Sequence, residues 1–238
     1  MISCIFAFYL AVFAVSMPAQ TVDADSLYAR RNDLASAQQA VDVWAKRLAQ
    51  NPRDFDAAWK LARARYWLGP RVPEAERRPT LESGITAARA AIAAQPERPE
   101  GHFWLAANMG ALAESFGLRQ GLKYRGDIKS ELLTVLRIDP AFQQGSADRA
   151  LGRWYYRVPG LFGGSKEKSE EHLRRSLQYN PNSTASHYFL AETLIARSRD
   201  ADARAELQRV LDAPIDPNWT PEDREFKERA RRLLAQMK

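Results

Sequence analysis

The sequence has little of the side-chain chemistry that most enzymes need. Its 238 residues include one cysteine, Cys4, and three histidines. Cys4 lies in an N-terminal segment that is expected to be removed. The remaining chain would then have no disulfide, no thiol nucleophile and no cysteine metal site. No zinc-protease, phosphate-loop or serine-hydrolase signature occurs. We therefore expect a protein that is not an enzyme, with no catalytic residue, no metal site and no cofactor.

The histidines are better placed for packing than for chemistry. His102 and His187 each stand three residues before a leucine of a predicted helix, Leu105 and Leu190. Equivalent positions in successive repeats favour a packing role over metal binding. His172, by contrast, lies in the second helix of a predicted helix pair.

Positive charge is in mild excess, with 35 Lys and Arg against 29 Asp and Glu and a net charge of +6. A basic balance suits phosphate, an acidic protein or a membrane surface. No nucleic-acid motif accompanies it, so arginine pairs such as Arg174 and Arg175 are interpreted as solvated helix faces. We expect no nucleic-acid partner.

The first 22 residues hold no charged side chain, and the run from Cys4 to Val15 is apolar. This pattern predicts a signal peptide over residues 1–20, with small residues for cleavage at Ala14-Val15-Ser16 or near Ala19, and hence an exported, periplasmic or cell-envelope protein. The alternative is an uncleaved anchor, although a full bilayer crossing needs about 20 apolar residues. Cys4 precedes the apolar run, so it is not placed as a lipoprotein cysteine. Residues 21–32 are expected to be a polar linker or a short helix.

The remainder of the chain repeats. Prolines at 52, 96, 140, 181 and 217 each follow Asn, Gln or Asp, at spacings of 44, 44, 41 and 36 by subtraction. Before the first four prolines, three residues recur at fixed offsets, mostly as small, large and small, and the last repeat has a set with the same internal spacing. The sets are Ala40, Trp44, Arg47; Gly84, Ala88, Ala91; Ile128, Leu132, Val135; Ser169, Leu173, Ser176; and Ala203, Leu207, Val210.

These offsets indicate pairs of closely crossing helices. A small residue lets two backbones approach, a large residue fills the notch, and proline stops the second helix. With Leu151, Gly152 and Tyr155 in the preceding helix, the pattern resembles the tetratricopeptide repeat, whose period is about 34 residues. The excess length is expected in insertions at 71–79 and 117–126. The second is a separate segment or an extension of the preceding helix broken at Gly121.

The expected fold is therefore an all-α, right-handed tetratricopeptide-like solenoid of about four helix pairs. It covers residues 33–219, and residues 220–238 form a C-terminal capping helix that covers the last repeat.

One phrase narrows the resemblance. Leu151-Gly152-Arg153-Trp154-Tyr155-Tyr156-Arg157-Val158-Pro159-Gly160, followed by Gly163-Gly164 and Lys166-Glu167-Lys168, resembles the T-component (TatT-type) proteins of TRAP transporters. The same region is more distantly similar to the regulators of microtubule dynamics. The first resemblance implies a periplasmic helical-repeat protein that works beside a solute-binding protein.

A binding surface is expected where the first helices of the repeats line the concave side. When the first helices are aligned by their repeat positions, the following residues are predicted to face the concave side: Trp59, Arg63, Tyr66, Phe103, Trp104, Arg149, Arg153, Tyr156, Arg157, Tyr188 and Glu192. Aromatic walls with arginines suit an anionic ligand or an acidic peptide, with Arg63, Arg149 and Arg153 as charge partners. The alternative is that Trp59, Trp104 and Tyr155 pack between helices and that the arginines pair with Glu192.

The apolar residues Leu161 and Phe162 lie in a glycine-flanked loop. They either fold over the groove or join a second copy of the chain in a homo-oligomer, or they pack onto their own helix pair.

Two functions remain open at this stage. The first is a non-enzymatic scaffold that binds a protein or acidic peptide through an open groove. The second is a transporter accessory that binds an anionic small molecule in a pocket enclosed by the insertions and works with a periplasmic solute-binding protein.

Overall fold

The computed structural model describes residues 23–237, and every regular element in this range is helical. The leader expected at residues 1–20 lies outside the described residues. The helices are α1 (Ala24–Ala29), α2 (Leu34–Gln50), α3 (Phe55–Leu68), α4 (Glu74–Ala94), α5 (Pro99–Phe116), α6 (Leu118–Ile138), α7 (Phe142–Arg157), the 3-10 turn η1 (Gly160–Phe162), α8 (Lys166–Tyr179), α9 (Thr184–Ile195), α10 (Asp200–Asp212) and α11 (Thr220–Gln236).

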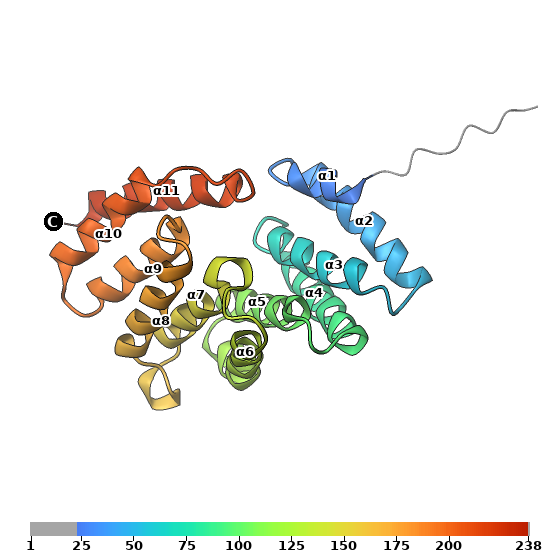
Figure 1. Cartoon of the computed structure of the whole chain (residues 1–238), viewed down its shortest axis with the longest axis horizontal. Coiled ribbons are helices and arrows are strands. Elements are labelled where there is room, and N and C mark those ends of the chain that lie inside the picture. Colours follow the sequence, from blue (N-terminus) through green and yellow to red (C-terminus); the bar gives the residue numbers. More distant parts are fainter. Residues whose placement is uncertain (1–22, 238) are drawn as a thin grey trace, which may run out of the picture.

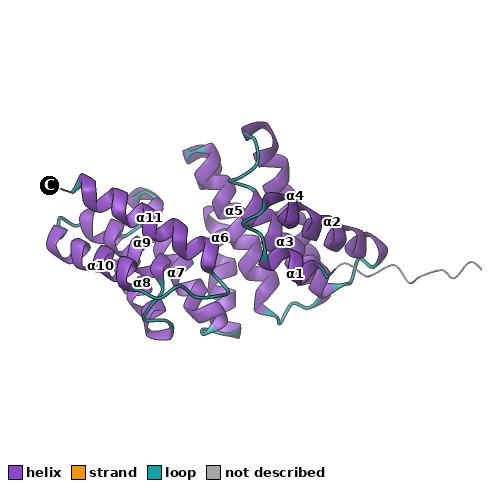
Figure 2. Cartoon of the chain, turned by 90° about the horizontal axis from the view of Figure 1, so that it is seen from above, coloured by secondary structure: helices purple, strands orange, loops and turns teal. Residues whose placement is uncertain are grey.

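The helices stack as successive pairs, α3 with α4, α5 with α6, α7 with α8 and α9 with α10. Figure 1 shows the pairs following one another around an arc, and Figure 2 shows the same helices from above. The first helix of each pair faces the hollow of the arc, so α3, α5, α7 and α9 supply much of its inner wall. The expected all-α helical solenoid is confirmed.

Polar caps start several of these helices. Asp33, Asp54, Ser165 and Ser183 each accept a hydrogen bond from a backbone N–H two or three residues further on. Such a cap satisfies N–H groups that have no partner within the first helical turn. The local sequence therefore sets where α2, α3, α8 and α9 begin.

The small and large residues counted back from the prolines form the helix-pair interfaces. Leu132, Leu173 and Leu207 are almost fully buried, as are the small residues around them. Arg47 is the exception: it is exposed, and its guanidinium reaches the cap residue Asp54 at 2.8 Å.

Gly152 shows how tight these crossings are. A Cβ atom added to Gly152 would lie 2.5 Å from Cγ of Leu173 on α8. The Gly152 carbonyl also accepts a hydrogen bond from the Ser169 hydroxyl at 2.8 Å. The absence of a side chain at Gly152 thus lets α7 and α8 come close enough for this bond.

The two expected insertions are helical, which corrects both their boundaries and the expected break. Most of 71–79 belongs to α4, which starts at Glu74 with Glu74 and Glu76 in its first turn. Acidic side chains there complement the positive end of the helix dipole. In the second insertion the chain turns at Gly117, with φ of 80°, and Gly121 lies inside α6. Glycine adopts that φ at no steric cost, so the break falls at 117.

The two chain ends also pack against the arc. Residues 21–32 contain α1, so the short-helix alternative is the one found, and its Leu27 and Tyr28 are buried. At the other end, Phe226, Leu233 and Leu234 of α11 pack against the apolar core of α8, α9 and α10. Figure 1 shows α1 and α11 facing each other across the opening of the arc.

Candidate functional site

The hollow of the arc holds a cavity of about 1060 Å³. Small-molecule sites are typically about 300–1,000 Å³, so this volume suits a ligand of that class. Its wall is built from α3, α5, α6, α7, α9 and α11. α11 and the segment before it enclose one side. Residues of both expected insertions also line the wall, among them Arg71, Leu122 and Arg125.

Six of the residues predicted from repeat register line this cavity. They are Tyr66, Phe103, Trp104, Arg149, Arg153 and Arg157. Five others do not contribute to its wall: Trp59, Arg63, Tyr156, Tyr188 and Glu192. Repeat register therefore located the inner face of α5 and α7 better than that of α3 and α9.

Arg149 is an arginine of the cavity wall whose charge has no partner in residues 23–237. Within the described part of the chain, its guanidinium makes no hydrogen bond and no ion pair. Burial lowers the pKa of Arg149, opposed by the nearby Tyr66 and Asp223. Arg149 is only partly exposed, and a cation held there without a partner is costly; an anion bound beside it would reduce that cost.

The side chains around Arg149 leave room for such an anion. Burial raises the pKa of the Tyr66 phenol, so it keeps its proton and can donate a hydrogen bond. The oxygens of Asp223 are already engaged, by the Thr184 hydroxyl at 2.6 Å and the Asp216 N–H at 2.9 Å. Arg149 and Tyr66 are thus two donors on the wall of the same cavity, and neither has an acceptor among the described residues.

Arg153 has a different environment, although it lies one helical turn from Arg149. Its Nε is 2.9 Å from Oε1 of Glu114 and its Nη1 is 2.7 Å from Oε2 of Glu192. The same guanidinium lies 4.8 Å from the ring centre of Phe189. The expected alternative, pairing with Glu192, is what the structure has for Arg153. Arg157 is half exposed and lies 3.6 Å from Glu114.

Arg63 and Trp59 are part of the packing between α1, α2 and α3. The Arg63 guanidinium lies 4.1 Å from the ring centre of Tyr28 and 4.9 Å from that of Trp59. Its nearest carboxylate is Asp25, at 3.8 Å. These contacts hold α1 against α3 and direct the charge of Arg63 away from the cavity.

Aromatic rings form the apolar part of the wall. Trp104 stacks obliquely on Tyr66 and meets Phe103 edge-on, with ring centres 5.6 and 5.0 Å apart. Across the cavity, Phe189 meets Phe226 of α11 at 5.4 Å. Tyr188 lies behind this wall, buried and in contact with Phe226.

Several wall residues come from parts of the chain that repeat register did not reach. They are Arg71, Trp219, Glu222, Glu225 and Phe226. Four of the five belong to α11 or to the turn before it, which the sequence suggested only as an outer cover. The polar and acidic start of α11 carried no signal that it faces inward.

In the loop after α7, Val158 and Pro159 line the cavity, whereas Leu161 and Phe162 lie outside its wall. The Leu161 side chain is 90% exposed, whereas Phe162 is partly covered and lies 5.8 Å from the Arg125 guanidinium. Phe162 thus packs locally, and Leu161 points to solvent. Folding of this loop over the cavity is not observed.

The histidines pair with carboxylates in a repeated arrangement. His187 Nδ1 lies 2.6 Å from Glu206 and its Nε2 lies 2.8 Å from the Pro181 carbonyl. His102 makes the same two contacts in an earlier helix pair, with Glu131 and the Pro96 carbonyl. Both rings therefore tie the start of a first helix to the preceding turn and to the second helix. In residues 23–237, no cluster of three or more metal-ligating side chains occurs.

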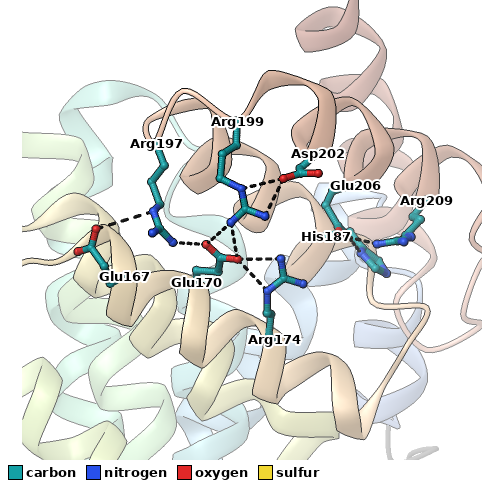
Figure 3. Close-up of polar contacts among 9 residues, drawn as sticks. All are labelled: Glu167, Glu170, Arg174, His187, Arg197, Arg199, Asp202, Glu206 and Arg209. Carbon is teal, nitrogen blue, oxygen red and sulfur yellow. Dashed lines mark hydrogen bonds and ion pairs between the residues drawn. The ribbon is translucent and has the colours of Figure 1, made fainter.

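A second charged cluster joins α8 to the α9–α10 turn, away from the cavity (Figure 3). Glu170 receives ion pairs from Arg174 at 2.7 Å, Arg199 at 3.0 Å and Arg197. Burial opposes the charge of Glu170, but hydrogen bonds from Arg174 and Arg199 outweigh it and lower the pKa of Glu170. Glu167 and Asp202 contact the outer sides of Arg197 and Arg199. This cluster is internally balanced and holds the last repeats together.

Among the helices that the structure describes, none has the length and apolar content needed to span a membrane.

Two protein families match the sequence. The family described as TRAP transporter T-component matches residues 98–238. The family described as Regulator of microtubule dynamics protein 1-3 matches residues 21–162. Each match covers more than half of the chain. A comparison with curated protein sequences found no significant match.

Solved structures of helical-repeat proteins resemble the fold. TTC0263, a thermophilic TPR protein of Thermus thermophilus, has a TM-score of 0.66 and 22% identity, with 89% of this chain and 95% of that chain covered. PilF of Pseudomonas aeruginosa has a TM-score of 0.53 and 18% identity, with 90% and 91% covered. MamA of Desulfovibrio magneticus has a TM-score of 0.52 and 14% identity, with 82% and 97% covered. At these identities the likeness establishes the tetratricopeptide-type fold.

Proposed function

Because this chain is a tetratricopeptide-type protein that belongs to the TRAP transporter T-component family, we propose that it is a non-enzymatic accessory of a TRAP-type solute transport system. In this role it binds a small organic anion in the central cavity. Its protein partner is a periplasmic solute-binding protein, and the protein itself works in the periplasm or cell envelope after export.

The observation that carries this proposal is the Arg149 guanidinium. It lines an aromatic cavity of small-molecule size and has no partner among the described residues. Tyr66 adds a second donor at the same place. The other inner arginine, Arg153, is already held by two glutamates. We therefore assign the anion to Arg149 and Tyr66, with Phe103 and Trp104 against the apolar body of the ligand.

The test uses two probes of the same shape. 8-Anilinonaphthalene-1-sulfonate carries a negative charge, and N-phenyl-1-naphthylamine has the same rings without the sulfonate. A charge-assisted hydrogen bond is worth about 1.5–3 kcal/mol, so R149A should weaken binding of the sulfonate roughly 10- to 150-fold. Binding of the neutral probe should be nearly unchanged. Fluorescence titration measures both affinities.

Arg89 provides a matched control, because it is exposed on α4 and lies outside the cavity wall. R89A should bind both probes as the parent does. Equal loss of both probes in R149A would mean a damaged cavity, and no loss of the sulfonate would sink the assignment of the anion to Arg149.

A second candidate function is a protein-binding scaffold in the same compartment. It is supported by the tetratricopeptide-type fold and by the exposed Leu161, which offers an apolar contact for another protein. In this case the arginines of the inner face would hold an acidic peptide segment. Affinity capture from the native cell envelope separates the two. A protein retained by the parent and lost by R149A/R153A supports the scaffold, whereas a solute-binding protein retained by both supports the transporter accessory.

A further inference from the structure

The N-terminal and C-terminal halves of the arc are joined at two places, and the contacts differ in kind. One apolar core runs through α1 to α7, from Ala24 to Tyr155, and a second runs through α8 to α11, from Leu173 to Ala230. Continuous helix packing between α7 and α8 joins the two halves along the back of the arc. At the front, where Figure 1 shows α11 opposite α1, the contacts that join the halves are polar.

Two ion pairs make this front contact, together with a hydrogen bond from Arg31 Nη2 to the Asn218 carbonyl at 2.9 Å. Arg31, at the end of α1, binds Glu222 of α11 through both ends of its guanidinium, Nε to Oε1 at 3.1 Å and Nη2 to Oε2 at 2.6 Å. Arg71, after α3, binds Glu225 of α11 at 2.7 Å. The partners are 191 and 154 residues apart in the chain. We call these four residues the clasp.

The N-terminal half holds its two clasp arginines in place before they meet α11. The Arg31 and Arg71 guanidinium groups lie 5.3 and 3.3 Å from the ring centre of Trp67. The Trp67 indole N–H donates to the Arg31 carbonyl at 3.0 Å, and Arg71 donates to the Trp67 carbonyl at 2.9 Å. One tryptophan thus orders both arginines, so little side-chain freedom is lost when the clasp closes.

The C-terminal half holds the glutamates equally firmly. Asp223, between them in sequence, accepts hydrogen bonds from Thr184 of α9 and from the Asp216 backbone. The apolar face of α11 packs on the second core through Phe226. The start of α11 therefore moves with the C-terminal half, and the clasp is the seam at which the two halves can part.

The clasp also borders the cavity, since Arg71, Glu222 and Glu225 are part of its wall. We propose that the clasp is a gate: its two ion pairs close the front of the arc, and their opening admits the ligand to the cavity. This inference rests on the ligand site proposed above. The Arg71–Glu225 pair is partly exposed and weakens with salt, whereas the more buried Arg31–Glu222 pair is screened less. Polar contacts of this kind can be exchanged for water, which suits a gate, whereas an apolar seam would stay shut.

The seam can be measured without any ligand. Spin labels at N32C and R224C, in a full-length chain that also carries C4S, report the distance across it by pulsed electron resonance. Both positions are exposed, and neither makes a side-chain contact within the described residues. We expect one narrow distance at low salt for the parent. The E222Q/E225Q variant should add a longer population at low salt, and 1 M salt should add the same population to the parent.

E228Q is the matched control. Glu228 lies on the exposed side of α11 and pairs only with Arg231 and Arg232 of its own helix. Its removal should leave the distance unchanged. A distribution in E222Q/E225Q that equals the parent's at every salt concentration would overturn the clasp, provided that circular dichroism shows the helices intact.

Ligand entry is measured separately by stopped-flow binding of 8-anilinonaphthalene-1-sulfonate. The association rate should rise at least threefold in E222Q/E225Q and stay unchanged in E228Q. A seam that opens without any change in this rate would overturn the gate. If the parent does not bind the sulfonate at all, the proposed ligand site fails, while the distance measurement still decides whether the clasp exists.

Discussion

Arg149 and Arg153 illustrate how far a residue's role depends on its neighbours. Both are arginines on the inner face of α7, and both line the same cavity. Glu114 and Glu192 neutralise Arg153, whereas Arg149 meets only an uncharged phenol and an occupied carboxylate. The first is therefore a structural bridge between α5, α7 and α9, and the second is the one suited to bind a ligand.

Glu170 leads to a prediction on pH. Hydrogen bonds from Arg174 and Arg199 outweigh burial and hold the pKa of Glu170 below its ordinary value of 4.5. A carboxyl group with a lowered pKa in the folded state contributes stability above its unfolded pKa, and this contribution is lost as the pH falls through the folded pKa. We expect E170Q to cost about 1–3 kcal/mol at pH 7 and less at pH 3.

Urea unfolding at pH 7, 5, 4 and 3 measures this difference. E171Q is the control, because Glu171 is exposed and pairs only with Arg175 at 3.3 Å. Its effect should be small at every pH. A cost of E170Q that stays constant from pH 7 to pH 3 would contradict the lowered pKa.

At the scale of elements, the spacing between helices depends on a few missing side chains. Gly152 faces Leu173 at the crossing of α7 and α8. Alanine is the better helix former by about 1 kcal/mol, yet overpacking of a tight crossing costs about 1–3 kcal/mol. We expect G152A to lower the free energy of unfolding by up to about 2 kcal/mol.

Gly126 provides the opposite case within α6. A Cβ atom added there would have no neighbour within 4 Å. G126A should therefore stabilise the protein by about 0.5–1 kcal/mol through helix propensity alone. Thermal and urea unfolding of the two variants should shift in opposite directions, and a shift in the same direction would argue against a tight crossing at Gly152.

The first helices of the pairs differ from the second in what they can offer a ligand. Their inner face carries aromatic rings and arginines, while the second helices carry the small and large residues of the pair interfaces. The division follows from the pair geometry, because the first helices lie on the concave side of the arc and the second helices lie behind them.

At the scale of the whole molecule, α11 has two structural roles. It covers the apolar core of the last pairs with Phe226, Leu233 and Leu234, and its first turn closes the front of the arc. A chain that ends at residue 218 should lose both. We expect it to unfold at a lower temperature and to self-associate, because Tyr188 and Phe189 would lose the cover of Phe226.

Calorimetry and light scattering on this shortened chain test the prediction. The E222Q/E225Q variant is the informative comparison, since it opens the front and keeps the apolar cover. It should keep the oligomeric state of the parent. A shortened chain with the stability and the oligomeric state of the full one would show that α11 is not needed as a cap.

The sequence alone determined the repeat, the helix pairs and most of their boundaries. Prolines, caps and the small and large residues act over a few helical turns, so their pattern is legible without a structure. It also placed six residues on the wall of the hollow, Arg149 among them. The extra residues were predicted to lie in insertions, because a family repeat of about 34 residues has no room for helices as long as α4 and α6. In the structure these residues lengthen the two helices.

Only the tertiary structure decided which arginine is free, and that the hollow is closed. Both depend on contacts between residues far apart in the chain, such as Arg153 with Glu114 and Arg31 with Glu222. Such a contact depends on how small rotations accumulate from one pair to the next around the arc. Repeat spacing in the sequence indicates how each helix pair packs on the next, but not the total rotation over all pairs. The contact between the α1 and α11 ends of the arc could therefore not be predicted from the sequence.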